Sequence, residues 1–398
     1  MKHFKIDVSQ DKVDDLARRL VATRLPDTIF QPGSDDGVDL SFMQRLLDYW
    51  RDQFDWRAQE KRLNALPQFI ADVGGFRVHY IIKRGVGPSP APIILTHGWP
   101  GSFVEFETIS DCLADPARHG GDPEDAFDVI VPSLPGFGFS SAPDAAGTSS
   151  RRIAELWHTL MQELGYREYF AQGGDIGAGV STWLGALYPH NVLGVHLNYM
   201  SAGFRPPLGP GLPPQTEEEA AFFQRVAQFS AKEGAYALLH ATKPQTLAFA
   251  LSDSPLGLAA WISEKFQSWV DHDGDLEAVV PLDTLLTNIC IYWFGNSIDA
   301  SLRLYKENRL NPLVLDSLLP CDVPFSIAHF PKELPIPPRS WIERGLRVER
   351  WTELPRGGHF AALEQPKLLA EDIRASFRPW RGRIAGNGSQ GRAAPKLV

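Results

Sequence analysis

Residues 169–179 read YFAQGGDIGAG, and this stretch decides the fold. Its first four residues form a short apolar run that is typical of a buried strand, and a helix-like stretch follows the glycines. Small residues on both sides of Asp175 permit a tight, strained turn, which lifts one side chain above the end of a sheet. Taken alone, the stretch allows a second interpretation, in which Asp175 only caps the helix after a glycine-rich turn.

Strand and helix patterns alternate around this turn. Strand-like runs rich in β-branched and aromatic residues occupy 76–84, 91–97 and 127–136. An amphipathic helix follows them, which Ser149 or Ser150 can cap and Gly165 ends. Such alternation predicts an α/β fold with a mostly parallel central sheet and crossover helices on its faces.

The strand pattern is interrupted once and then resumes, which divides the chain into five segments. Helical patterns fill most of the stretch between about residues 201 and 310, after a proline-glycine connector, and strand-like runs return at 321–330 and 346–354. We therefore expect a helical cap inserted into an α/β core, preceded by a largely helical N-terminal extension and followed by a disordered tail. The expected bounds are 1–73 for the extension, 74–200 and 312–380 for the core, 201–311 for the cap and 381–398 for the tail.

Composition excludes several classes of protein. The 398-residue chain has 39 Lys+Arg against 48 Asp+Glu and no basic stripe, which argues against a nucleic-acid partner. Its 43% hydrophobic content is ample for a large core. Cys112, Cys290 and Cys321 lie far apart without metal-ligand spacing, which favours a reducing compartment. The N-terminus does not resemble a signal peptide, and no apolar run reaches the ~20 residues of a membrane span. We therefore expect a soluble, cytoplasmic protein without a membrane anchor.

Two further segments favour a catalytic interpretation of Asp175. HGWPGS, residues 97–102, directly follows a strand-like run, and GGHF, residues 357–360, places His359 on a loop after the last such run. In the α/β-hydrolase fold the nucleophile, an acid and a histidine base follow one another in this order. The backbone N–H groups of Trp99 and Ile176 would then form an oxyanion hole. The plainer alternatives are an ordinary tight turn for HGWPGS and a structural role for His359.

Together these motifs resemble those of the microsomal-type epoxide hydrolases, which combine the α/β-hydrolase fold with a characteristic N-terminal domain. The resemblance extends from about residue 3 to residue 380 and rests on the segments FDWR, HGWPGSFVEF, VPSLPGFGFSS, QGGDIG, LAAWISEKFQSW, LRLYKEN, FPKELPIPPRSW and RGGHFAALEQP. It implies the nucleophile Asp175, the base His359, the orienting acid Glu333 and the paired cap tyrosines Tyr236 and Tyr305. The membrane anchor of the mammalian microsomal members has no counterpart in this sequence, which implies a soluble relative. The resemblance also leaves a homodimer open.

The chemistry of these residues agrees with the resemblance. An Asp175 carboxylate that opens an epoxide forms an alkyl ester, which water can hydrolyse, whereas a serine would form an inert ether. His359, oriented by Glu333, would activate that water, and two phenols would assist at the epoxide oxygen. From the residues alone some alternatives stay open: Asp322 or Glu349 as the acid, Tyr292 as a cap phenol, and plain helix packing for Tyr236 and Tyr305.

The sequence therefore predicts an enzyme that hydrolyses an epoxide to a vicinal diol and needs neither a cofactor nor a metal. A haloalkane or haloacid dehalogenase is the first alternative, because it also uses an aspartate nucleophile on this fold. Trp99, which we assign to substrate binding as well, keeps that alternative open because its indole N–H could hold a halide. A catalytically silent, small-molecule-binding homologue is the second alternative. A carboxylesterase is disfavoured, because the residue at the apex of the turn is not serine.

Aromatic residues of the expected cap indicate what kind of epoxide would bind. Five of them would suit a small apolar or aromatic substrate: Trp261, Phe266, Trp269, Trp293 and Phe294. The alternative is that these side chains only form the core of the cap itself.

Overall fold

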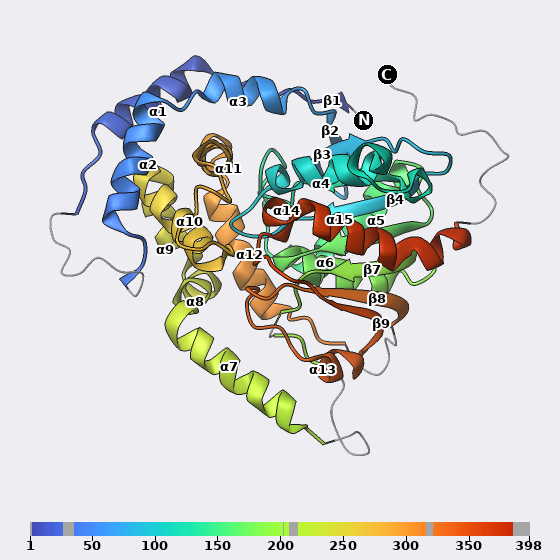
Figure 1. The fold of residues 1–398 in the computed structure, drawn as a ribbon. Coiled ribbons are helices and arrows are strands. Elements are labelled where there is room, and N and C mark those ends of the chain that lie inside the picture. The colour runs from blue at the N-terminus through green and yellow to red at the C-terminus, as the bar shows by residue number, and fades with distance from the viewer. Residues whose placement is uncertain (1, 27–35, 202, 207–213, 316–320, 385–398) are drawn as a thin grey trace.

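A mixed sheet of nine strands forms the centre of this computed structural model, which describes residues 2–26, 36–201, 203–206, 214–315 and 321–384 (Figure 1). The strand order is β1-β2-β3-β5-β4-β6-β7-β8-β9. Neighbours from β1 through β3 to β5 pair antiparallel, and all the later pairs are parallel. The strands are β1 (Lys2–His3), β2 (Gln68–Val73), β3 (Phe76–Lys83), β4 (Ala91–Thr96), β5 (Phe127–Pro132), β6 (Tyr169–Gly173), β7 (Val192–Leu197), β8 (Cys321–His329) and β9 (Leu346–Glu353).

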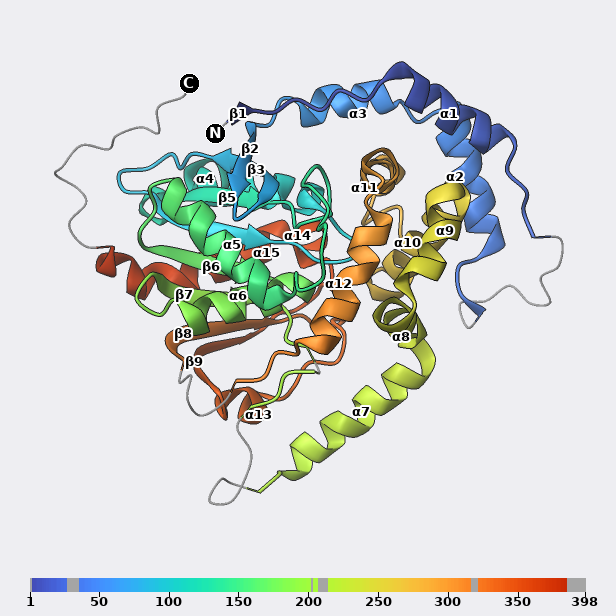
Figure 2. The ribbon, with the colours of Figure 1, turned by 180° about the vertical axis from the view of Figure 1, so that it is seen from behind.

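Helices cover both faces of the parallel strands. Every residue of β4, β6 and β7 is buried, as expected for strands that are covered from both sides. The helices α4 (Glu107–Ala114) and α15 (Pro366–Phe377) pack together on one face, and α5 (Ser150–Glu163) and α6 (Asp175–Leu187) lie on the other (Figures 1 and 2). The short helix α13 (Arg339–Glu343) packs against β9, and α14 (Ala361–Glu364) packs against α4 and α15. The predicted sheet, mostly parallel and flanked by helices, is confirmed.

The sequence patterns located some elements well and missed others. Helix α5 has Ser149 at its N-cap position and is followed by Gly165 at a φ of 87°, as predicted, although the Ser149 side chain makes no hydrogen bond to the helix. Strand β2 lies in a stretch that we expected to be helical, and it pairs with β3 through a glycine hairpin. Strand β7, in the helix-like stretch after the Asp175 turn, is a continuous apolar run. Such a short run has no alternation that would distinguish a buried strand from a buried helix.

A helical cap covers the carboxyl ends of the central strands. It consists of α7 (Glu217–Glu233), α8 (Ala235–Thr242), α9 (Pro244–Asp253), α10 (Pro255–Trp269), α11 (Leu282–Gly295) and α12 (Ile298–Leu310). Helix α7 extends away from the others along one side of the molecule, whereas α12 lies against the core (Figures 1 and 2). Helices are thus found where the strand pattern stops. Most of the proline-glycine connector before α7 lies outside the described residues.

The N-terminal segment arches around the cap and ends in the sheet. Its helices are α1 (Gln10–Val21), α2 (Leu40–Asp52) and α3 (Trp56–Leu63) (Figures 1 and 2). The Trp56 ring packs 4.8 Å from the ring of Phe294 in α11, and the Tyr49 hydroxyl donates to Asp283 at 2.9 Å. The segment therefore ties the cap to the sheet, because β1 and β2 on either side of its helices pair with each other at the sheet edge.

Three remaining expectations concern the ends, the cysteines and the membrane. The chain continues after α15 as a short 3-10 helix, Arg378–Arg383, and most of the expected tail lies outside the described residues. Cys112, Cys290 and Cys321 are buried free thiols. Within the part of the chain that the structure describes, no helix combines the length and the apolarity that crossing a bilayer requires.

Candidate active site

The turn that carries Asp175 is strained and closely packed. Strand β6 ends at Gly173, α6 begins at Asp175, and Asp175 itself has a φ of 47°. A positive φ is uncommon for a residue other than glycine, and such strain is often found at functional sites. A Cβ atom at Gly177 would lie 1.9 Å from the carbonyl oxygen of Thr96, so only glycine lets the turn approach β4 this closely. The nucleophile-type turn expected from the sequence is therefore present.

The backbone at Trp99 faces the Asp175 carboxylate. The Trp99 N–H donates to Asp175 Oδ1 at 2.8 Å, from the loop that follows β4. Ile176, the second residue expected in an oxyanion hole, is the next residue of the turn and lies in the first turn of α6. The N-terminus of α6, where Asp175 and Ile176 lie, favours negative charge on the Asp175 carboxyl group.

His359 and Glu333 complete an array with Asp175. His359 Nδ1 lies 2.6 Å from Glu333 Oε1, and His359 Nε2 lies 3.5 Å from Asp175 Oδ2. Glu333 follows β8, and His359 follows β9. Because these strands are parallel to β6, both loops lie at the same carboxyl end of the sheet as the Asp175 turn. The rival acids lie elsewhere: Asp322 is exposed at the opposite end of β8, and Glu349 pairs with Arg347 on the surface of β9.

The charge state of His359 depends on these two carboxylates. Burial opposes its charged form, but Glu333 and Asp175 outweigh burial and raise the pKa of His359 well above its usual range. The raised pKa favours the protonated imidazole at neutral pH. Loss of the Asp175 charge would remove part of this support and lower the pKa of His359.

The two predicted cap tyrosines stand over Asp175. Tyr236 comes from α8 and Tyr305 from α12, and their ring centroids are 5.9 Å apart. Burial, followed by the Asp175 carboxylate, raises the pKa of the Tyr236 phenol, so it remains a neutral donor. Both tyrosines line a cavity of about 750 Å³, together with Asp175 and Ile176. The structure thus brings together Asp175 and two phenols around a space large enough for a small-molecule ligand.

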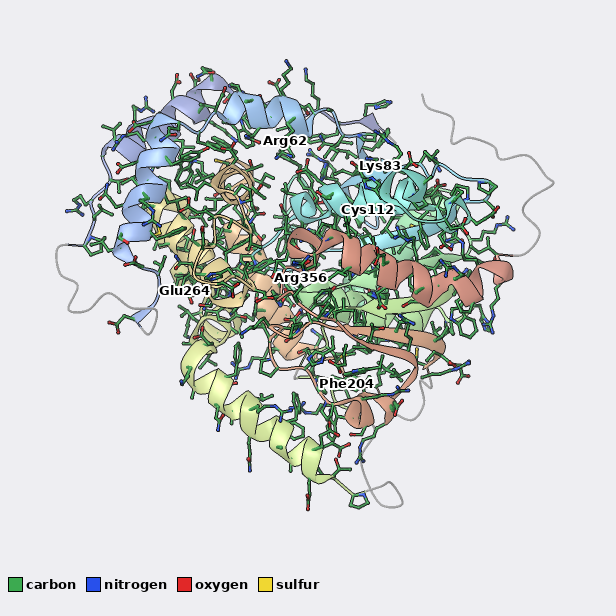
Figure 3. The ribbon with its side chains drawn as sticks, in the orientation of Figure 1. Arg62, Lys83, Cys112, Phe204, Glu264 and Arg356 are labelled. Carbon is green, nitrogen blue, oxygen red and sulfur yellow. The ribbon has the colours of Figure 1, made fainter. Side chains whose placement is uncertain are left out.

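Other side chains hold the tyrosines from behind. The Trp99 ring stacks on Tyr236 with centroids 5.4 Å apart and meets Tyr305 edge-on at 5.9 Å. The ammonium group of Lys265 lies 4.5 Å from the centre of the Tyr236 ring and pairs with Glu264, which Figure 3 labels on the cap. The Trp99 side chain is not part of the lining of the 750 Å³ cavity, so its expected contact with substrate stays a prediction.

The five Trp and Phe residues of the cap that we expected near the substrate are Trp261, Phe266, Trp269, Trp293 and Phe294. None of the five lines the 750 Å³ cavity, whose apolar walls include Trp183, Phe229, Leu238 and Leu334. Trp293 lies under the guanidinium of Arg19, and the others pack within the cap or against its neighbours. These contacts agree with the alternative interpretation, in which the five side chains form the core of the cap. Tyr292 likewise is structural, because its hydroxyl donates to the Gly101 carbonyl at 2.8 Å.

Sequence reasoning missed Tyr199, which follows β7. Its ring meets His359 edge-on with centroids 5.7 Å apart, and it lines the 750 Å³ cavity. A signal for it existed, because residues after neighbouring parallel strands converge at one edge of the sheet. The signal depended on recognising β7 as a strand.

Glu364, also missed, fixes the loop of His359. Its carboxylate accepts the backbone N–H groups of Gly358 and Phe360, each at 2.8 Å, and that of Asp271 from the cap at 2.7 Å. The backbone N–H of His359 in turn donates to the Trp269 carbonyl at 3.0 Å. The loop is therefore bonded both to the core and to the cap where the two meet, near Arg356 in Figure 3.

Fold and site together define an α/β-hydrolase with an aspartate at the nucleophile position, and comparison with known proteins narrows this class. The family model "Epoxide hydrolase N terminus" matches residues 1–106, and that of the alpha/beta hydrolase fold matches residues 91–229. Epoxide hydrolase 1 of Oryctolagus cuniculus is 38% identical over 94% of this chain and 88% of its own length. A Stigmatella aurantiaca protein, provisionally named an epoxide hydrolase, is 44% identical over 96% of this chain and 85% of its own length.

Solved structures agree with these sequence comparisons. The Aspergillus niger epoxide hydrolase has a TM-score of 0.82 and 33% identity, covering 95% of this chain and 96% of that one. The juvenile hormone epoxide hydrolase of Bombyx mori has a TM-score of 0.83 and 28% identity, covering 96% of this chain and 95% of that one. The chain therefore belongs to the epoxide hydrolase family of the α/β-hydrolase fold and is a hydrolytic enzyme.

Proposed function

We propose that this enzyme converts an epoxide into a vicinal diol through an ester of Asp175. The observation that carries the proposal is the position of the Asp175 carboxylate between a histidine–glutamate pair and two phenols that share one apolar cavity. A carboxylate nucleophile, a base and two acids at the leaving oxygen are what a cofactor-independent opening and hydrolysis of an epoxide needs.

In the first step, Asp175 attacks one epoxide carbon and the carbon–oxygen bond of the ring breaks. The phenol of Tyr236 or Tyr305 transfers its proton to the oxygen that leaves the carbon, so the alkoxide is neutralised as it forms. A hydroxyalkyl ester of Asp175 results, and the carboxylate loses its charge. The pKa of His359 then falls, because burial is opposed by one carboxylate instead of two, and His359 releases its proton to solvent.

In the second step, neutral His359 takes a proton from a water molecule that attacks the carbonyl carbon of the ester. The backbone N–H groups of Trp99 and Ile176 would hold the oxyanion, and a donor of this kind is worth ~3–4 kcal/mol. Collapse of the tetrahedral intermediate releases the diol, which takes the proton held by His359. The second proton of the water returns to the tyrosinate left by the first step. The re-formed Asp175 carboxylate raises the pKa of His359 again, so His359 takes up a proton from solvent and the enzyme is regenerated.

The substrate class follows from the walls of the cavity. At about 750 Å³ and with mainly apolar side chains around Asp175, the cavity suits a small apolar or aromatic epoxide. The dehalogenase alternative is disfavoured, because the phenols of Tyr236 and Tyr305 line this cavity beside Asp175 while the Trp99 indole does not. Three buried free thiols are compatible with action in the reducing cytoplasm, and sedimentation of the purified enzyme would test the homodimer that the family resemblance leaves open.

The proposal is tested with styrene oxide and two substitutions. Wild type should release phenylethanediol, Asp175→Ala should release none, and His359→Gln should accumulate a protein whose mass is increased by one styrene oxide on the peptide that contains Asp175. Diol formation by Asp175→Ala at the wild-type rate would contradict the assignment of the nucleophile. Chloride release from 1-chlorohexane without turnover of any epoxide would favour the dehalogenase.

A further inference from the structure

A second carboxyl group, which the mechanism above does not use, lies beside the nucleophile. Glu105 belongs to the 3-10 turn Phe103–Phe106, which follows the loop that carries Trp99. Together with Asp175 and His359 it lines a small cavity of about 20 Å³. That volume is enough for one water molecule.

The small cavity and the large cavity have only Asp175 in common among the residues that line them. Tyr236 and Tyr305 line only the large cavity, Glu105 and His359 line only the small one, and Asp175 lines both. An alkyl group attached to Asp175 in the first step would occupy the large cavity. The small cavity then remains as the space in which water can meet both His359 and the ester.

The carboxyl group of Glu105 is held in this position by close packing. A Cβ atom built on Gly101 would lie 1.3 Å from Glu105 Oε1, so the carboxyl group fills the space that any larger residue at 101 would occupy. No arginine or lysine among the described residues forms an ion pair with Glu105, so its oxygens are not committed to a counter-ion.

The charge of Glu105 responds to the state of Asp175. Burial, with a further contribution from the Asp175 carboxylate, raises the pKa of Glu105 to about 8, whereas His359 and the Ser102 N–H act in the opposite direction. Esterification removes the Asp175 charge, and proton transfer from water makes His359 cationic. Both changes favour the Glu105 carboxylate during the second step, when a hydrogen-bond acceptor for water is needed.

We propose that Glu105 acts together with His359 to hold the hydrolytic water in the small cavity and to aim it at the ester carbon of Asp175. One O–H of the water donates to His359 Nε2, which removes that proton, and the other O–H donates to the Glu105 carboxyl group. The water oxygen forms the new bond to the Asp175 carbonyl carbon, and the bond from that carbon to the diol oxygen breaks. This role rests on the proposed ester mechanism and adds a residue to its second step.

Glu105→Gln tests the role, because the amide keeps the size of the side chain and weakens it as an acceptor. Excess enzyme is mixed with styrene oxide, and the reaction is quenched after increasing times. Mass spectrometry of the intact protein then gives the rates of ester formation and of ester loss. We expect ester loss to slow about 10- to 100-fold, as for the loss of a hydrogen bond to a charged group, and ester formation to change less than about twofold. The ester should therefore accumulate in the steady state, and kcat and KM should fall together.

Two further variants keep the test decisive. Gly101→Ala retains the carboxyl group and displaces it, so it should reproduce the selective slowing of ester loss, and it serves if Glu105→Gln fails to fold. Glu107→Gln is the matched control, because Glu107 lies two residues further on and pairs with Arg62 of the N-terminal segment, outside both cavities (Figure 3). It should leave both rates unchanged.

The possible outcomes separate this role from the proposed function. Unchanged ester loss in both Glu105→Gln and Gly101→Ala would overturn the role of Glu105. An equal decrease of both rates would also overturn it, because it would indicate a structural defect of the whole site. If wild type forms no ester on Asp175 at any time, the proposed mechanism itself fails, and the inference fails with it.

Discussion

Glu333→Gln should slow the hydrolysis of the Asp175 ester, so that the ester accumulates. Glu333 Oε1 lies 2.6 Å from His359 Nδ1, and both side chains are almost fully buried, with 0% and 3% of their surface exposed. The substitution removes the carboxylate that does most to raise the pKa of His359. It also lets an amide N–H donate to Nδ1, which would leave the proton on Nε2, where the base must be free.

The size of the effect follows from this geometry. Removal of an orienting carboxylate that fixes the tautomer of a catalytic histidine costs about 10⁴-fold in a comparable triad, and loss of the charged hydrogen bond alone costs about 10- to 100-fold. We therefore expect ester hydrolysis to slow by about 10²- to 10⁴-fold. Ester formation should decrease much less, because it depends on Asp175 and the two cap tyrosines.

The assay is a rapid-quench reaction with intact-protein mass spectrometry, in which the variant should show a full burst of ester followed by slow decay. Asp322→Asn and Glu349→Gln are matched controls, because they remove the rival acids of the two late strands and should leave both phases unchanged. Normal ester decay in Glu333→Gln together with slow decay in either control would refute the assignment of the acid.

Three further predictions follow from the same structure. Tyr236→Phe and Tyr305→Phe should each slow ester formation by about 10- to 100-fold and leave ester hydrolysis unchanged in the same assay, with the double variant slower than either; equal losses in both steps would contradict their role at the epoxide oxygen. His359 is expected to stabilise the fold fully below its unfolded pKa of about 6.5, and this contribution should be lost as pH rises through its raised folded pKa. Urea unfolding of wild type and His359→Gln between pH 6 and 10 measures the difference between their free energies of unfolding. Wild type should lose stability relative to His359→Gln as the pH rises; a constant difference would argue against a raised pKa of His359. Trp56→Ala should reduce the free energy of unfolding by about 3–5 kcal/mol, because it removes a buried ring from the contact with Phe294 between the N-terminal segment and the cap; calorimetry with an unchanged melting temperature would show that this contact does not hold the cap.

The sheet and its crossover helices could be predicted because their signals are local. The apolar face of α5, its N-cap position at Ser149 and its end before Gly165 are all contained in one stretch of sequence. Strand β7 could not be distinguished in this way, because six buried residues in a row fit a strand or a helix equally well. Its position depends on pairing with β6 and β8, which no local pattern records.

The residues of the site also differ in whether a local sequence pattern could predict them. Asp175 and His359 were predicted from glycine-flanked turns whose spacing reflects backbone geometry. Glu333 could be separated from Asp322 and Glu349 only by its resemblance to a family, since all three are acids of the two late strands. In the structure the separation is physical, because a residue after the carboxyl end of β8 can reach His359 and a residue at the opposite end cannot.

Residues that act across the fold gave no usable signal. Glu105 lines the same small cavity as Asp175, and its carboxyl group occupies the space left by Gly101, which is visible only in three dimensions. Glu364 is one acid in a helical stretch, and its importance lies in three backbone N–H groups from two separate segments. The aromatic residues of the cap are the opposite case: the sequence left open whether they face the substrate, and none of the five lines the 750 Å³ cavity.

The central claim, that Asp175 forms an ester that water then hydrolyses, is tested most directly by isotope labelling. Excess enzyme reacts once with styrene oxide in water enriched in the heavy oxygen isotope, and both the diol and the peptide that contains Asp175 are weighed. The ester mechanism predicts label in the Asp175 carboxylate and a diol that is mostly unlabelled after the first turnover. Label in the diol with an unlabelled peptide would mean that water attacks the epoxide directly, and Asp175 would not be the nucleophile.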